Sequence, residues 1–230
     1  MTKITAKFHK LFGLPASRIS TVPTGIDLQR FHPEGPKAVL PIPTDAVDLP
    51  LIGMVSVLRS WKGHPIFFQA ARILKDAGVR VHFVVVGGGA SVEYFQNLAR
   101  KHGVGDCVAF TGHREDVPEI LRALSVLAIP STRHEGVPQI GLQALACRTP
   151  VIGSDAGGIP EIIRNGETGR IFPANDSASL AAKIQTALNQ PEETRRMVER
   201  GRALVEAEHS FDAMLDKVDA IYRRYLPAAI

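Results

Sequence analysis

The chain has 230 residues, enough for one large domain or two small ones, and 45% of them are hydrophobic, so a substantial core can form. The net charge of +4 is compatible with a phosphorylated small ligand or an anionic membrane surface, but no basic stripe interleaved with aromatic residues supports binding to nucleic acid. No apolar run approaches the roughly 20 residues that a membrane-spanning helix needs.

The first 18 residues carry basic side chains and no acid, and their apolar side chains recur with a helical period. This pattern predicts an amphipathic helix. Two alternatives stay open: a targeting peptide, although the long apolar core of a secretory signal is missing, and a segment that contacts a membrane surface. A short strand over Arg18–Val22 is expected next, and then a proline-rich loop over 32–50. The apolar positions of the helix are Ile4, Phe8, Leu11 and Phe12.

Six apolar strands alternate with helices between residues 51 and 172. Strands that are apolar throughout are expected where both faces of a sheet are covered, and the alternation predicts an α/β fold with a doubly wound, Rossmann-like parallel sheet. In such sheets, ligands bind beyond the carboxyl ends of the strands. The expected strands are Leu51–Val57, Val81–Val86, Cys107–Phe110, Val126–Ile129, Pro150–Ser154 and Gly169–Phe172. The expected helices are Pro65–Ala77, Val92–His102, Val117–Leu124, Pro138–Cys147, Pro160–Arg164, Ala178–Leu188, Glu192–Glu206 and Phe211–Tyr225.

The loop after the strand Val126–Ile129 ends in Glu-Gly-Val-Pro, where a helix begins. Pro138 suits the first turn of a helix, because its missing N–H costs nothing there, and Gly136 lets a ligand approach the backbone. The free N–H groups and positive dipole end of that helix form an anion site. Glu135 lies just outside this site, and Gln143 lies about 7.5 Å further along the helix axis. The spacing fits the diphosphate of a nucleotide-sugar.

Two cations, Arg59 and Lys62, follow the first strand of the alternation, in a loop at a helix start. An arginine offers paired N–H groups and a lysine a point charge, so together they suit a diphosphate. A solvated basic loop without function is the alternative.

Two further loops follow strands and are candidates for ligand contact. The run Gly87-Gly88-Gly89 lets a phosphate or a sugar approach the backbone, although a plain tight turn explains it equally well. It does not complete the Gly-x-Gly-x-x-Gly fingerprint, so a nicotinamide cofactor is not expected. In the next such loop, Arg114 is a candidate contact to a base or ribose. Asp116 either caps the following helix or contacts the ligand.

The chain has eight histidines without metal-ligand spacing, so no metal site is predicted. Cys107 and Cys147 both lie in apolar contexts, which favours buried free thiols in a reducing compartment over a disulfide.

Six stretches of the sequence, taken in order, resemble the C-terminal, donor-binding half of retaining glycosyltransferases of the two-domain GT-B fold, the family called group 1 or family 4. The resemblance covers roughly residues 19–188. The stretches are VPTGIDLQRFHP (Val22–Pro33), LRSWKGH (Leu58–His64), FVVVGGG (Phe83–Gly89), FTGHREDVPEIL (Phe110–Leu121), EGVPQIGLQALA (Glu135–Ala146) and TPVIGSDAGGIPEII (Thr149–Ile163).

The resemblance implies transfer of a sugar from a nucleotide-sugar with retention of configuration and without a bound metal or cofactor. Arg59 and Lys62 would neutralise the leaving diphosphate, where charge builds up in the transition state. Glu135 would bind hydroxyls of the donor sugar, Gln143 the ribose, and Arg114 with its loop would cover the base. The remaining donor contacts are expected from Gly87 and Gly88 and from the backbone of Gly136, Val137, Pro138 and Gln139.

Three departures from the family pattern matter. Gln143 stands where the family usually has a second glutamate, and Val57 where many members carry an arginine, for which Arg59 is the candidate substitute. The family's acceptor-binding N-terminal domain is expected to be missing: residues 1–18 would be its end or a linker, residues 19–190 the donor domain, and the helices of 191–230 would cross back onto that other domain.

The expected function is therefore the donor half of a cytoplasmic glycosyltransferase in cell-envelope polysaccharide or glycolipid assembly. Its partners would be the nucleotide-sugar donor and a domain or chain that supplies the acceptor site, and a peripheral contact with the inner face of the membrane stays open. The alternatives are a module that binds nucleotide-sugars without turnover and a remnant without an independent role.

Overall fold

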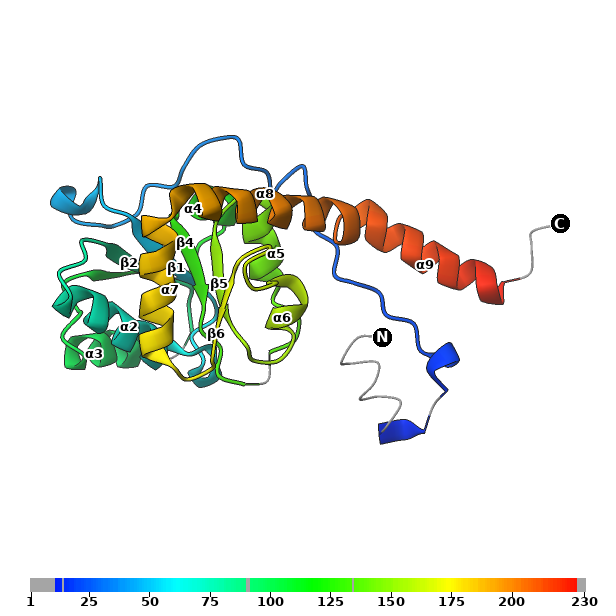
Figure 1. Cartoon of the computed structure of the whole chain (residues 1–230), viewed down its shortest axis with the longest axis horizontal. Coiled ribbons are helices and arrows are strands. Elements are labelled where there is room, and N and C mark those ends of the chain that lie inside the picture. Colours follow the sequence, from blue (N-terminus) through cyan, green and yellow to red (C-terminus); the bar gives the residue numbers. More distant parts are fainter. Residues whose placement is uncertain (1–10, 14, 90–91, 134, 227–230) are drawn as a thin grey trace.

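A computed structural model describes residues 11–13, 15–89, 92–133 and 135–226. Six parallel strands form one sheet in the order β3-β2-β1-β4-β5-β6, with helices on both of its faces (Figure 1). This confirms the predicted doubly wound α/β fold. The strands are β1 (Leu51–Val55), β2 (His82–Val86), β3 (Val108–Gly112), β4 (Val126–Ile129), β5 (Val151–Ser154) and β6 (Arg170–Phe172).

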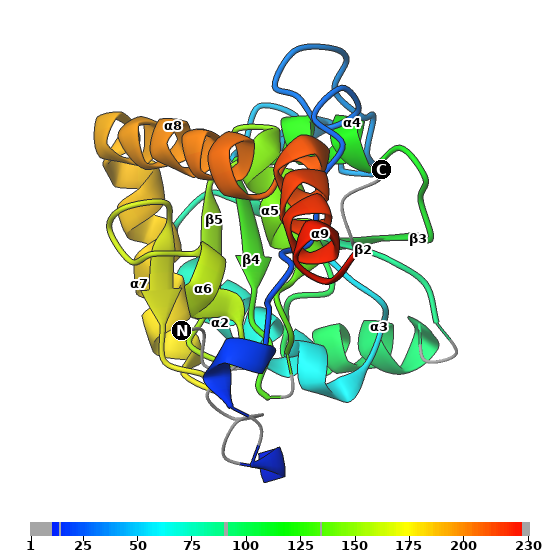
Figure 2. The same cartoon turned by 90° about the vertical axis from the view of Figure 1, so that its right-hand side faces the viewer.

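The sheet separates two hydrophobic cores, because successive side chains of a strand point to opposite faces. Ile52 and Phe83 belong to the core that packs against α2, α3 and α7, while their neighbours Leu51 and Val84 belong to the core under α4, α5, α6 and α8. Figures 1 and 2 show these two layers of helices. The helices are α2 (His64–Asp76), α3 (Val92–Lys101), α4 (Val117–Ala123), α5 (Gln139–Ala146), α6 (Ile159–Ile162), α7 (Ser177–Asn189), α8 (Pro191–Glu208) and α9 (Phe211–Tyr225).

The elements expected from residue 51 onwards all form, with ends that differ by at most two residues. The strand expected over Arg18–Val22 was wrong. Residues 16–18 form a single 3-10 turn and residues 19–25 have no regular structure, because this segment lies away from the sheet and has no strand to pair with (Figure 1). The helix predicted within residues 1–18 falls largely outside the described residues.

Helix α8 packs on the sheet domain, whereas α9 leaves it. Gly201 of α8 crosses α5 so closely that a Cβ at this position would lie 2.6 Å from Leu145 Cδ2. Helix α8, which begins just after the domain boundary expected at residue 190, thus packs against α5. Helix α9 has no buried residue and projects from the body (Figure 1). Its exposed apolar side chains are Phe211, Leu215, Tyr222 and Tyr225.

The segment that enters the domain is fastened to the start of α9. Ile26 N–H donates to the His209 carbonyl at 2.7 Å, and Phe211 N–H donates to the Ile26 carbonyl at 3.2 Å. Gly25 lies directly under α9, where a Cβ would come within 2.7 Å of the Phe211 ring. Residues 15–22 and α9 consequently leave the body on the same side (Figures 1 and 2).

Candidate functional site

The loops after β1 and β4 meet at the edge of the sheet where ligand binding was predicted. These two strands are neighbours in the sheet although β2 and β3 separate them in sequence, and the strand order reverses here. In open parallel sheets, ligand crevices form at this point. Lys62 Nζ, from the first loop, lies 2.9 Å and 2.8 Å from the two carboxylate oxygens of Glu135, from the second. The structure thus brings together the two charged residues placed at this edge from the sequence.

Backbone contacts between the same loops hold this ion pair in place. Thr132 N–H donates to the Trp61 carbonyl at 2.8 Å. Gly63 has a φ of +83°, and a Cβ there would lie 1.7 Å from the Pro130 carbonyl oxygen. Both the left-handed backbone and the close approach require glycine. The LRSWKGH stretch therefore needs its glycine for packing, independently of any ligand.

The Glu135 side chain is only 10% exposed, and that of Lys62 is 25% exposed. The Ser131 hydroxyl also donates to Glu135 Oε2 at 2.6 Å. The Glu135 carbonyl accepts from Gly158 N–H at 3.0 Å, so both the side chain and the backbone of this residue are fixed. Because water screens a largely buried ion pair poorly, the attraction between Lys62 and Glu135 is stronger than in an exposed pair.

The second cation of the basic loop behaves differently from the first. Arg59 is exposed, and its guanidinium carbon lies 5.4 Å from the centre of the Trp61 ring, a cation–π distance. The contact of Arg59 with a diphosphate stays a prediction. So does its replacement of the arginine that many family members carry at the position of Val57.

His64, which follows the basic loop at the start of α2, is fully buried. Its ring centre lies 4.3 Å from that of Phe95 in α3. Burial lowers the pKa of His64 to about 4, with the nearby Lys62 charge acting in the same direction. His64 is therefore neutral at pH 7 and adds no charge to the loop.

The buried His64 predicts a loss of stability in mild acid. The unfolded chain binds a proton at His64 below about pH 6.5, but the folded chain binds it only near pH 4, so the free energy of unfolding should fall as the pH drops through this window, by about 3 kcal/mol. Urea unfolding of wild type and His64→Gln between pH 7 and 4.5 measures this, because the variant lacks that titration. Equal pH slopes for the two proteins would contradict it.

A cleft of about 530 Å³ opens between the loops after β1, β2 and β3 and the start of α5, and the described residues that line it do not include Arg59, Lys62 or Glu135. Its volume lies in the range of small-molecule sites. Five of the predicted donor-binding residues line it: Gly87, Gly88, Arg114, Gln139 and Gln143. The exposed Val57 and His113 also face this cleft.

Gly87 has a packing role in this cleft that the sequence left open. Its φ is +143°, and a Cβ would lie 1.9 Å from the Ser56 carbonyl oxygen. The glycine run therefore lets the loops after β1 and β2 pack closely, and Leu58 N–H donates to the Gly88 carbonyl at 3.1 Å. Because the close packing itself requires Gly87, the tight-turn interpretation holds whether or not a ligand approaches Gly88.

The start of α5 differs slightly from the predicted anion site. The helix begins at Gln139, and Pro138 occupies the position before it, without a side-chain cap for the first N–H groups. Gly136 is exposed, and a Cβ there would meet nothing within 4 Å, so packing does not require glycine at this position. Val137 faces a second cleft, of about 550 Å³, next to residues 21–24, the end of α8 and Lys217 of α9.

Arg114 lines the main cleft but already has a partner. Its Nε donates to Asp116 Oδ1 at 2.7 Å, and this bond raises the pKa of Arg114 and lowers that of Asp116. Asp116 makes no side-chain cap for α4, so the capping alternative was wrong. A ligand that contacts Arg114 would bind a guanidinium that its neighbour already orients.

Three residues that were not predicted from the sequence support Glu135: Ser131, Ser154 and Gly157. Ser131, two residues after β4, and Ser154, the last residue of β5, are both fully buried. Ser154 Oγ donates to the Ser131 carbonyl at 2.6 Å. Gly157 has a φ of +56°, and a Cβ would lie 2.0 Å from the Glu135 carbonyl oxygen. Their only sequence signal was that both serines lie at or just after the end of an apolar strand.

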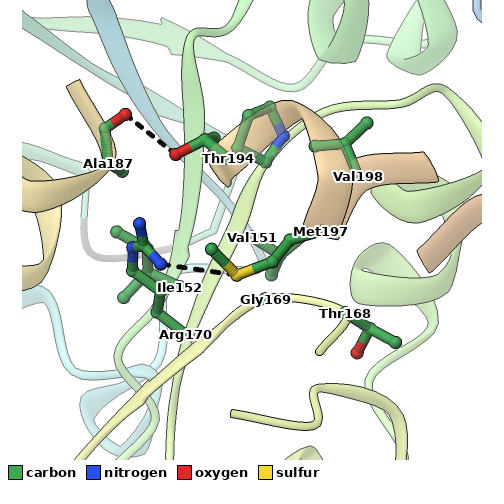
Figure 3. Close-up of a pocket in the computed structure, with 10 residues that line it drawn as sticks. Val151, Ile152, Thr168, Gly169, Arg170, Ala187, Thr194, Met197 and Val198 are labelled. Carbon is green, nitrogen blue, oxygen red and sulfur yellow. Dashed lines mark hydrogen bonds between the residues drawn. The ribbon is translucent and has the colours of Figure 1, made fainter. Parts of the chain in front are cut away.

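A separate small cavity lies between β5, β6, α7 and α8 (Figure 3). Figure 3 shows Arg170 reaching toward Met197, with Nη1 3.4 Å from the sulfur, and Thr194 donating to Ala187. The cavity measures about 10 Å³, close to the space of one water molecule. It also lies at the amino ends of β5 and β6, away from the ion pair, so it does not compete as a nucleotide site.

Three further observations concern metals, membranes and thiols. Among the described residues, no three His, Cys, Asp or Glu side chains gather as metal ligands would. None of the helices in the described ranges is long and apolar enough to cross a bilayer. Both cysteines are free. Cys147 is buried, which raises its pKa to about 11, and Cys107 is half-buried.

The sequence matches the family model described as glycosyl transferases group 1 over residues 42–204, which include every loop of the site described above. The chain belongs to the group 1 glycosyl transferases. The predicted family is thereby confirmed.

Relatives within the group 1 glycosyl transferases are similar over most of this chain. It is 29% identical to a D-inositol 3-phosphate glycosyltransferase of Saccharomonospora viridis, over 95% of this chain and 53% of that protein. It is 28% identical to a GDP-mannose-dependent alpha-(1-6)-phosphatidylinositol monomannoside mannosyltransferase of Mycolicibacterium smegmatis, over 86% of this chain and 54% of that protein. The chain thus spans about half the length of these curated relatives.

The fold also matches a solved structure, the C-terminal domain of a group 1 family glycosyl transferase from Francisella tularensis. The TM-score is 0.68 at 24% identity, and the match covers 81% of this chain and all of that domain. This group 1 chain therefore has the fold of a C-terminal domain in its family.

Proposed function

We propose that this chain is the donor-binding half of a retaining glycosyltransferase that transfers a sugar from a nucleotide-sugar to a cell-envelope glycan or glycolipid. The observation that carries the proposal is the contact between Lys62 and Glu135 at the reversal of strand order. Glu135 lies in the loop that leads into α5, and Gln139, the first residue of α5, lines a cleft large enough for a nucleotide.

The charges at this point suit a leaving diphosphate. An ammonium has three N–H donors, so Lys62 can hold both Glu135 oxygens and still donate to a phosphate oxygen. When the bond between the sugar and the diphosphate breaks, the electron pair stays on the phosphate. Lys62, Arg59 and the first N–H groups of α5 would stabilise that charge.

The remaining donor contacts follow from the cleft. Gln143 and Arg114 line it together with Gly87 and Gly88, in keeping with ribose and base contacts on one side of the diphosphate. Glu135 would then accept hydrogen bonds from the sugar on the other side. Gly136, Val137, Pro138 and Gln139 would contribute through their backbone, and no metal is expected to take part.

The proposed partner of this half is an acceptor-binding domain, in the same polypeptide or in a separate chain. The chain spans about half the length of its curated relatives, and α9 presents apolar side chains that the rest of the domain does not bury. An exposed apolar face of this kind is typical of an interaction site. We place the protein in the cytoplasm, with a peripheral contact at the inner face of the membrane where a glycolipid acceptor would lie.

A second function is supported by the same observations: a module that binds a nucleotide-sugar but needs the separate acceptor domain for turnover. All of the proposed donor contacts lie within this chain, whereas no acceptor site has been assigned to it. Release of nucleoside diphosphate by this chain alone, in the presence of an acceptor, would favour the enzyme over the binding module.

A thermal-shift screen tests donor binding. UDP, GDP, ADP and their sugars are the probes, and the corresponding monophosphates are controls that lack the diphosphate. A ligand at 100 times its Kd should stabilise the fold by about 2.7 kcal/mol, which corresponds to a rise in Tm of roughly 5–10 °C for a domain of this size. If no diphosphate raises the Tm, both proposed functions fail.

A further inference from the structure

We propose that Ser131 is a positioning residue that holds the Glu135 carboxylate ready for the donor sugar, an inference that rests on the proposed function. Ser131 lies two residues beyond the end of β4 and is fully buried. Its hydroxyl donates to Glu135 Oε2 at 2.6 Å. That distance is typical of a hydrogen bond from a hydroxyl to a charged carboxylate, the stronger class of hydrogen bond.

Ser131 is itself held by the neighbouring strand. The hydroxyl of Ser154, the last residue of β5, donates to the Ser131 carbonyl at 2.6 Å and accepts from Ala156 N–H at 3.4 Å. Ser154 is also fully buried. Strands β4 and β5 pair up to Ile129, so this connection continues their ladder beyond the last strand residue. Ser131 thus ties Glu135 to the rigid sheet, which is what a precise binding site needs.

The contact with Ser131 becomes important when Lys62 turns to a phosphate. In the structure, Glu135 is held by Lys62 and Ser131 together. A diphosphate draws on the same ammonium and repels the carboxylate. The Ser131 hydroxyl is uncharged, so a diphosphate attracts it less strongly than it attracts the Lys62 ammonium. The hydrogen bond from Ser131 to Glu135 therefore persists in the complex.

The other role open to Ser131 is purely structural, as a buried hydroxyl that stabilises the loop. Thr149 is the matched control for that role. It is 2% exposed, and its hydroxyl donates to the Leu121 carbonyl at 2.7 Å. Thr149 precedes β5, at the opposite end of that strand from Ser154. Thr149→Val removes a buried hydrogen bond away from the ion pair.

The test is calorimetric titration of the full chain with matched pairs of probes: UDP and UDP-glucose, GDP and GDP-mannose, and ADP and ADP-glucose. For the pair that binds most tightly, Ser131→Ala should lower the affinity for the nucleotide-sugar about tenfold. Its affinity for the free nucleotide should stay within about twofold of wild type, because Glu135 contacts the sugar in the proposed complex. Thr149→Val should change neither affinity.

Two further variants sharpen this test. In a Glu135→Gln background, Ser131→Ala should add little, because residues that act through one contact are not additive. If Ser131→Ala does not fold, Ser131→Cys keeps the side-chain volume with a much weaker donor and should show the same split between the two probes. Urea unfolding confirms that each variant is folded before titration.

The outcomes separate this inference from the proposed function. Equal losses for nucleotide and nucleotide-sugar, or no loss for either, would overturn the role of Ser131 while leaving donor binding intact. A wild-type chain that binds free nucleotide and gains nothing from the sugar would also overturn it. If wild type binds none of the six probes, the proposed function itself fails, and the inference fails with it.

Discussion

Lys62→Ala is expected to weaken the binding of a nucleoside diphosphate by about 1.5–3 kcal/mol, or roughly 10- to 150-fold, the range for hydrogen bonds to charged groups. The effect combines two losses. The phosphate loses a cation, and Glu135, whose side chain is only 10% exposed, keeps its negative charge next to the site without the counter-ion that now lies 2.8 Å away. Isothermal titration with UDP, GDP and ADP measures the change directly.

Lys75→Ala is the matched control for this result. Lys75 also forms an ion pair, with Asp106 at 2.7 Å, but it lies at the end of α2, far along the helix from the basic loop. The control should leave nucleotide affinity unchanged. Equal affinities for wild type and Lys62→Ala would show that the loop after β1 is only a solvated basic loop, the alternative that the sequence left open.

Gly63→Ala is expected to lower the free energy of unfolding by about 3–4 kcal/mol and to separate Lys62 from Glu135. A residue other than glycine at a φ of +83° is strained by about 1–2 kcal/mol. The added Cβ would also lie 1.7 Å from the Pro130 carbonyl oxygen, so the loops after β1 and β4 must move apart. Urea unfolding reports the stability, and nucleotide titration reports the site.

Gly78→Ala isolates the contribution of the close contact. Gly78 has a similar φ of +70°, but a Cβ there would meet nothing within 4 Å. This variant should therefore lose only about 1–2 kcal/mol from the backbone strain and keep its nucleotide affinity. If both variants lose the same stability, the contact between Gly63 and Pro130 does not matter for the fold.

The sheet could be predicted from the sequence because each of its strands is a short apolar run bounded by turn residues. His82–Val86 and Val126–Ile129 are buried on both faces, and such runs alternating with amphipathic helices leave few topologies. The expected strand at Arg18–Val22 failed for a physical reason. A strand needs a partner, and this segment lies away from the sheet, so its β-branched residues alone do not make one.

The site was only partly predictable, because a sequence shows charges and glycines but not the contacts between distant loops. Lys62 and Glu135 could be placed at one edge because both follow strands, and the structure places them in contact. The role of Ser131 could not be predicted, since a serine after a strand carries no signal of its own. It becomes visible only because β4 and β5 are adjacent and bring Ser154 behind it.

The fastening of Ile26 between His209 and Phe211 limits how α9 can move. The segment around Ile26 and the start of α9 lie side by side, with Gly25 packed against Phe211. A movement of α9 that keeps these contacts therefore also moves the segment that enters the domain. A displacement of α9 relative to the sheet must either break the two hydrogen bonds at Ile26 or carry residues 24–26 along with the helix.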